Sequence, residues 1–220
     1  MRYHCRRTLI ALAFACSIGA RGEAQDMMRA LNRAETTYRG IETLRAEFSQ
    51  TLHNPMLGEE VLSAGILVLA PPSRFAMRFT DPDGDRIVSD GTWLWIYLPS
   101  SVPNQVMRQP IPTRGAATPN LLAQFVDRPL EHYRAHFVGT DSVAGELVDV
   151  VSLLPRRDDD PFREAEVSIS RNTGLVRRLI VLEPAGQRRT IQFERLQPNV
   201  DIPKSELEFT VPNGARIVTP

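Results

Sequence analysis

The stretch from Ile87 to Pro99 limits the folds open to this chain more than any other part of the sequence. It contains the turn Ser89-Asp90-Gly91, in which Asp-Gly precedes a β-rich run and indicates a hairpin, because Gly takes positive φ without steric cost. In the run that follows, two sets of apolar residues alternate: Trp93, Trp95 and Tyr97 with Leu94, Ile96 and Leu98. A period of two predicts a strand that is apolar on both faces. Such a strand needs a core on one face and a second cover on the other.

The N-terminus has the pattern of a secretory leader. Basic residues at Arg2, Arg6 and Arg7 precede an apolar run over residues 8–18. Gly22 and Ala24 are small residues placed for cleavage, so we predict a cleaved signal peptide over residues 1–24 and export of the rest. An uncleaved membrane anchor would need about 20 apolar residues, more than this run supplies. A lipoprotein anchor at Cys16 is a further alternative, but the residues before it form a poor lipobox.

Cysteine usage and charge narrow the class of protein. Both cysteines, Cys5 and Cys16, lie in the predicted leader, so the exported chain must be held by its hydrophobic core and has no thiol for catalysis or metal binding. The chain has 26 basic and 26 acidic residues, so no net field attracts nucleic acid. Residues 25–220 are predicted to form a single domain.

The order of the predicted elements is helix, strands, short helices, strands. Asp26 as N-cap and Gly40 after the C-terminus bound a predicted amphipathic helix over residues 27–39. Thr118-Pro119 opens a short apolar helix, and residues 129–134 form a second. Strands are predicted at residues 44–51, 61–69, 74–79, 93–98, 105–108, 136–138, 147–154, 165–170, 175–182 and 190–196, with a last short one within 208–214. These elements predict a mainly β (α+β) domain with one curved antiparallel sheet.

The sequence contains no recognisable catalytic constellation. His132 and His136 would share one side of a helix, but Glu131 lies outside the pair and no third zinc ligand is evident. The three aspartates of residues 81–85 lack the downstream glutamate of a calcium loop. We find no Gly-x-Ser-x-Gly elbow and no phosphate-binding glycine loop. The sequence therefore predicts a binding protein, not an enzyme, with no metal and no cofactor.

Several motifs, in order along almost the whole exported chain, resemble the LolA family. The motifs are Leu44-x-x-x-Phe48-x-Gln50, Ser63-x-Gly65, Pro72-x-x-Phe75, Val88-Ser89-Asp90-Gly91-x-x-Leu94-Trp95-x-Tyr97-x-Pro99, Thr118-Pro119 and Phe209-Thr210-x-Pro212-x-Gly214. The segment from Ser89 to Pro99 is the most specific of these.

The resemblance implies an unclosed antiparallel β-barrel whose hydrophobic cavity is covered by an N-terminal helix and short lid helices. It also implies a monomeric periplasmic carrier of triacylated lipoproteins. Such a carrier receives its cargo from the inner-membrane LolCDE transporter and delivers it to LolB at the outer membrane.

One position departs from the family pattern. The family commonly has a basic residue directly before the proline of Pro-x-x-Phe, where it helps to latch the lid, whereas this chain has Pro71. Arg74 is nearby and is the candidate replacement.

The site residues follow from these patterns as a hypothesis. The predicted lid surface is Leu121, Leu122 and Phe125, and the predicted lining of the acyl-chain cavity is Phe48, Ile66, Val68, Phe75, Met77 and Trp95. Each buried CH₂ is worth roughly 0.8 kcal/mol, so one long acyl chain represents about 10 kcal/mol of gross binding energy. A lid that fills the empty cavity competes with the ligand and makes release feasible. On this interpretation, Trp95→Asp would abolish lipoprotein transfer.

Three other interpretations stay open at this stage. The chain could be a lipoprotein-sensing domain on the same fold, as in RseB, although it leaves little room for a second domain. It could be an exported enzyme acting on lipid or glycan, against which the missing nucleophile and base argue. It could also be a structural envelope protein, in which the lid residues simply complete a closed core.

Overall fold

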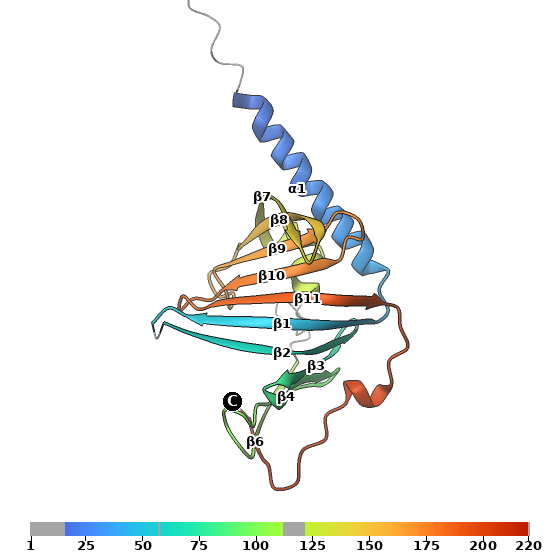
Figure 1. Cartoon of the computed structure of the whole chain (residues 1–220), viewed down its shortest axis with the longest axis vertical. Coiled ribbons are helices and arrows are strands. Elements are labelled where there is room, and N and C mark those ends of the chain that lie inside the picture. Colours follow the sequence, from blue (N-terminus) through green and yellow to red (C-terminus); the bar gives the residue numbers. More distant parts are fainter. Residues whose placement is uncertain (1–15, 57, 112–121, 220) are drawn as a thin grey trace, which may run out of the picture.

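The computed structural model describes residues 16–56, 58–111 and 122–219. It is a mostly β structure with an open 12-stranded sheet and a long N-terminal helix (Figure 1), as the sequence predicts. In chain order its elements are α1 Cys16–Arg39, β1 Leu44–Asn54, β2 Glu59–Ala70, β3 Arg74–Asp81, β4 Asp83–Asp90, β5 Trp93–Tyr97, β6 Gln105–Pro110, α2 Ala123–Val126, α3 Pro129–His132, β7 Tyr133–Val143, β8 Glu146–Pro155, β9 Glu164–Ser170, β10 Val176–Leu182, β11 Arg188–Pro198, the 3₁₀ turn η1 Lys204–Leu207 and β12 Arg216–Val218.

The sheet contains two runs of consecutive strands, β1–β6 and β7–β11, which meet where β1 lies beside β11. Its order is β12-β6-β5-β4-β3-β2-β1-β11-β10-β9-β8-β7, and β1 pairs with β11. Among the described strands, every pair is antiparallel except β12 with β6, which is parallel. The pairing of β1 with β11 joins the two halves of the meander into one continuous surface.

The two faces of the sheet have different covers. We call the face that carries Leu44, Ala46 and Phe48 the inner face; it is the face packed under α1 and α2. The opposite, outer face carries a smaller buried cluster of Val68, Ala76, Val88 and Leu207. Because residues alternate along each strand, both apolar sets of a strand can be buried only when both faces are covered.

Gly65 lets β2 and β3 approach closely at the inner face. In the strand register it lies opposite Phe48 on one side and Phe79 on the other. A Cβ atom at this position would lie 2.1 Å from the carbonyl oxygen of Arg78. With no side chain between them, the rings of Phe48 and Phe79 meet edge to face at 5.3 Å between centroids. The glycine therefore serves the packing of the inner face.

Helix α1 packs against the inner face through small residues and one partly buried ion pair. Ala30 and Ala34 are fully buried, four residues apart on one side of the helix. Arg33 donates to the carboxylate of Asp149 at 2.6 Å, which fixes the helix against β8. At the β9–β10 turn, Gly174 has φ of +75°, and a Cβ there would lie 2.4 Å from the hydroxyl of Thr37. The helix can lie this close to the sheet only because the turn residue has no side chain.

Two predicted helix boundaries are wrong. Helix α1 begins at Cys16 instead of residue 27, so Asp26 lies within the helix and pairs with Arg29 instead of capping the N-terminus. Glu23, Ala24 and Gln25, directly before Asp26, are exposed residues with good helix propensity, so the helix continues through them. The second short helix, α3, ends at His132, because β7 begins at Tyr133 and pairs with β8. His132 and His136 therefore lie on different elements.

The last predicted strand is also misplaced. Residues 208–215 are not a strand, and β12 forms later, at Arg216–Val218, beside β6. Phe209 stacks on Trp95 at 5.4 Å between ring centroids, and Pro212 has no N–H to donate to a ladder. The segment between β11 and β12, residues 199–215, therefore crosses the outer face before the chain adds β12 at the edge of the sheet (Figure 1). We call this segment the C-terminal strap.

Candidate functional site

The inner face of the sheet forms the main hydrophobic core of the described chain. Three of the predicted cavity residues, Phe48, Phe75 and Met77, lie in it and are nearly inaccessible to solvent. They come from β1 and β3, where every second residue faces inward. The structure therefore brings these three side chains together in the inner core.

The other three predicted cavity residues lie on the outer face. Val68 belongs to the outer cluster, and Ile66 packs against that cluster. In the register, Leu67 pairs with Ala46 and Leu69 with Leu44, which gives the inner positions of β2 to the odd-numbered residues. The structure does not bring Ile66 and Val68 together with Phe48.

Trp95 is on the outer face for the same reason. It pairs with Val88 of the outer cluster, while its neighbour Leu94 packs against the inner core. The indole Nε1 donates to Asp90 at 2.8 Å, and the ring stacks on Phe209 of the strap. The second cover that the apolar strand β5 requires is therefore the C-terminal segment of this chain.

Helix α2 covers part of the inner core with its apolar side. Leu122 precedes the helix and is buried, as are Phe125 and Val126 within it. Phe125 contacts Phe162 edge to face at 5.3 Å and stacks on Tyr133 at 6.1 Å between centroids. Two of the three predicted lid residues thus pack on the core, and Leu121 lies outside the described residues. Whether this helix acts as a lid stays a prediction.

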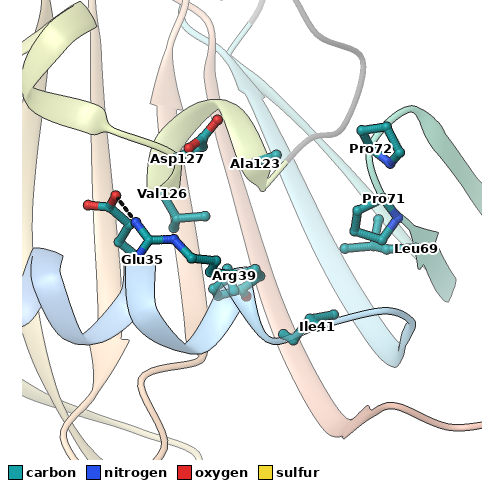
Figure 2. Close-up of a pocket in the computed structure, with 10 residues that line it drawn as sticks. Glu35, Arg39, Ile41, Leu69, Pro71, Pro72, Ala123, Val126 and Asp127 are labelled. Atoms are coloured by element: carbon teal, nitrogen blue, oxygen red, sulfur yellow. Dashed lines mark hydrogen bonds and ion pairs between the residues drawn. The ribbon is translucent and has the colours of Figure 1, made fainter.

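A pocket of about 250 Å³ lies at the seam between α2, the end of α1 and the β2–β3 turn (Figure 2). Its residues are mostly apolar, with a charged rim: Glu35, Tyr38, Arg39, Ile41, Leu69, Pro71, Pro72, Ala123, Val126 and Asp127. An apolar cavity of about 150 Å³ is large enough to bind benzene. This pocket can therefore admit a short apolar segment, while a larger ligand would need the inner core to open further.

The rim of the pocket carries charged side chains of both signs. Arg39 pairs with Glu35 at 2.6 Å, and Asp127 follows the end of α2 (Figure 2). Tyr38 accepts a hydrogen bond from the backbone N–H of Val176 at 3.3 Å, and burial raises the pKa of its hydroxyl. Sequence reasoning did not find this rim, because its members come from a helix end, a turn and a short helix that only the fold brings together.

Pro71 and Arg74 are separated by the fold. Pro71 lines the pocket together with Ala123 of α2 (Figure 2). Arg74 begins β3, and its Nε donates to the carbonyl oxygen of Asp90 at 3.2 Å, in the β4–β5 turn. Its backbone register with Asp90 places it with Ala76 on the outer face. The structure therefore does not bring Arg74 to α2, which argues against the predicted latch.

Metal-binding and membrane-spanning features are not found in the described part of the chain. These residues contain no cluster of three or more His, Cys, Asp or Glu side chains that could hold a metal ion. Of the three aspartates considered for calcium, Asp85 is nearly buried and accepts hydrogen bonds from Ser100 instead. No helix in the described ranges has the length and apolar character needed to cross a membrane.

Comparison with known proteins gives a family match over most of the chain. A sequence profile for the family described as outer membrane lipoprotein carrier protein LolA matches residues 39–210. The outer-membrane lipoprotein carrier protein of Chromobacterium violaceum is 27% identical over 211 residues, which cover 96% of each chain. Its counterpart in Azotobacter vinelandii is 28% identical over 210 residues, covering 96% of this chain and 95% of the relative. That of Pseudomonas aeruginosa strain PAO1 is 28% identical over 212 residues, covering 96% and 97%.

Solved structures with a similar fold are more distant in sequence. An uncharacterized conserved protein from Thermus thermophilus aligns with a TM-score of 0.55 at 15% identity, over 88% of this chain and 98% of that one. MucB aligns with a TM-score of 0.52 at 20% identity, over 84% of this chain and 63% of MucB. At these identities the likeness shows the fold alone.

Proposed function

Because this chain belongs to the LolA family of outer-membrane lipoprotein carrier proteins, we propose that it is a periplasmic chaperone for lipoproteins. In this proposal it binds the acyl chains of triacylated lipoproteins released from the inner membrane. It shields those chains from water and carries them to an acceptor at the outer membrane. A LolCDE-type transporter would load it and a LolB-type acceptor would unload it.

The observation that carries the proposal is the way α2 closes the inner core. Phe125 and Val126 are buried, yet the helix has only four residues and a pocket of about 250 Å³ lies at its seam. A short element seated by a few aromatic contacts is separable from the sheet at a lower cost than a strand of the ladder. Withdrawal of α2 would expose the ring faces of Tyr133 and Phe162 and enlarge the seam.

The balance of energies suits a carrier that must also release its cargo. Fully burying a side chain such as Phe or Val stabilises by about 1.5–3 kcal/mol each, so closing α2 onto the core offsets part of the gross binding energy of an acyl chain. The apparent affinity then falls by the fraction of molecules that are open. The closed state also hides an apolar surface that would otherwise promote aggregation.

A crosslink across the lid contact tests the proposal. The chain from residue 25 onward has no cysteine, so the pair Phe125→Cys and Phe162→Cys gives the only two thiols in a protein that lacks the predicted leader. These two positions are in contact, and a short thiol-to-thiol reagent would join α2 to the segment beneath it. We expect the linked protein to lose binding of a synthetic triacylated lipopeptide, and the untreated variant to retain it.

The matched control links two strands that are already paired. Thr51→Cys and Leu62→Cys are register partners on β1 and β2, away from α2, and their crosslink should leave lipopeptide binding unchanged. If the crosslink between positions 125 and 162 left binding at the level of the control, acyl chains would not need α2 to move, and the lid mechanism would be refuted. If the uncrosslinked native protein bound no lipopeptide, the carrier function itself would fail.

The relatives favour the carrier over the sensor interpretation. The lipoprotein carrier relatives match along nearly their whole length, whereas MucB is matched over 63% and shows the fold alone. Carriers of the LolA family are not enzymes, and we propose that this chain likewise works without catalysis or a cofactor. Depleting it in its host should strand outer-membrane lipoproteins at the inner membrane.

A further inference from the structure

One buried hydroxyl under α2 has no hydrogen-bond partner among the described residues. Tyr133, the first residue of β7, is fully buried, and its hydroxyl oxygen is shielded from solvent and unpaired. Burying a polar group without a partner is destabilising, which is why such groups in proteins are nearly always hydrogen-bonded. The position could have been filled by phenylalanine without this cost.

The surroundings of Tyr133 belong to the lid contact. Its ring stacks on Phe125 of α2 at 6.1 Å and lies 5.8 Å from Phe162 between centroids. Phe125 is thus the group that covers the ring of Tyr133 when α2 is closed. Withdrawal of α2 would remove Phe125 and uncover this side of the Tyr133 ring.

The hydroxyl is a hydrogen-bond donor at any physiological pH. Burial in an apolar site raises the pKa of Tyr133 to about 12, and the negative charge of Asp160 contributes in the same direction. The hydroxyl therefore keeps its proton, and in an apolar environment a hydrogen bond to an acceptor would stabilise it. By contrast, the hydroxyl of Tyr38 at the nearby pocket already has the N–H of Val176 as its partner.

We propose that the Tyr133 hydroxyl donates to an acyl carbonyl oxygen of the bound lipid. An acyl chain has one strong acceptor, the ester or amide carbonyl where it joins the head group, and the rest is hydrocarbon. A donor inside the lid contact would hold that carbonyl at a fixed depth, so that the chains run into the inner core and the lipoprotein polypeptide stays outside. This inference deepens the proposed carrier function and rests on it.

The contact also makes the site selective. A hydrocarbon leaves the hydroxyl unpaired, and an ether lipid has no carbonyl oxygen at the acyl position, so both forgo the gain of the hydrogen bond to that carbonyl. A net hydrogen bond contributes about 0.5–1.5 kcal/mol, equivalent to roughly a two- to tenfold difference in affinity. Tyr133 is thus a specificity-determining residue for ester- or amide-linked chains.

The test compares two lipids and three proteins. The probes are a lipopeptide with ester-linked chains and its analogue with ether-linked chains of the same length; the proteins are the native chain, Tyr133→Phe and the control Tyr38→Phe. We expect Tyr133→Phe to lower the affinity for the ester probe about two- to tenfold and to leave the affinity for the ether probe unchanged. Tyr38→Phe should change both affinities equally, because its hydroxyl is already engaged within the protein.

A spectroscopic measurement accompanies the binding data. With ¹³C-labelled ester carbonyls, the native complex should show a carbonyl stretch at lower frequency than the Tyr133→Phe complex, because a hydrogen bond weakens the C=O bond. An equal loss of affinity for both probes, or no loss for either, would overturn the proposal, as would identical carbonyl stretches. If the native protein bound neither probe, the carrier function would be refuted instead, so the two failures are distinguishable.

Discussion

Phe125→Ala gives a quantitative test of whether α2 is a removable cover or an integral part of the core. Phe125 is 2% exposed and contacts Tyr133 and Phe162. Truncating a buried phenylalanine to alanine lowers the free energy of unfolding by about 3–5 kcal/mol when the surrounding structure does not collapse into the cavity. In an ordinary core residue, that whole loss appears in the free energy of unfolding.

A removable cover gives a different result, because only the closed state loses the contacts. The open state is unaffected, so the stability of the folded ensemble falls by the same amount by which closing is weakened. A ligand that binds only the open state gains that same free energy, since its apparent affinity rises with the open fraction. A decrease of about 1.4 kcal/mol in the free energy of unfolding should therefore accompany a tenfold gain in lipopeptide affinity. A decrease of about 2.8 kcal/mol should accompany a hundredfold gain.

Urea unfolding and titration with a triacylated lipopeptide measure the two quantities on the same variant. The control is Val68→Ala in the outer cluster, which should lose about 2 kcal/mol of stability with no change in affinity. Tryptophan emission suits the unfolding measurement, since Trp93 and Trp95 lie away from the inner core. If Phe125→Ala lost the full 3–5 kcal/mol and bound the lipopeptide no more tightly, α2 would be part of a permanent core.

Three further predictions follow from single contacts. Gly65→Ala should destabilise by about 2 kcal/mol or more in urea unfolding, because the added Cβ would lie 2.1 Å from the Arg78 carbonyl oxygen; native-like stability would contradict the β2–β3 register. Trp95→Ala should lower stability through the lost Phe209 stacking but leave lipopeptide affinity unchanged, and loss of binding by the folded variant would restore Trp95 to the cavity. Burial alone would raise the pKa of Asp90, but hydrogen bonds from two backbone N–H groups and an indole lower it below its usual value. The contribution of the Asp90 carboxylate to stability is therefore present above about pH 4 and lost as the pH falls through the folded-state pKa. Asp90→Asn should reduce the loss of stability at acidic pH, as measured by unfolding from about pH 7 to pH 2.

Local patterns were sufficient for most of the secondary structure. The Asp90-Gly91 turn does form a hairpin between β4 and β5, and the alternation in β1 and β3 gives buried inner positions at Phe48, Phe75 and Met77. Turn chemistry and period-two alternation act within a few residues, so they can be recognised without knowledge of the rest of the chain. The motifs likewise indicated the family, which the match over residues 39–210 confirms.

Helix and strand ends were less predictable where distant pairing decided them. The segment after residue 207 has a strand-like composition, but its Phe209 is taken up by Trp95, and the ladder instead forms at β12 beside β6. Tyr133 was predicted to be helical because its neighbours suit a short helix, yet its pairing with Pro155 of β8 makes it a strand residue. In both places a partner many residues away outweighs the local preference.

The sequence by itself determined that the β5 strand has two apolar faces, but neither there nor in β2 did it determine which face is the inner one. A period of two separates alternate residues without giving either set a direction, and a strand that is apolar on both sides has the same pattern when turned over. Only the tertiary structure decided that Leu67 and Leu94 face the core while Val68 and Trp95 face the C-terminal strap. The physical reason is that the two sides of a sheet are distinguished by what packs on each, here α1 and α2 on the inner side and the C-terminal strap on the outer side, and these elements lie far apart in the chain.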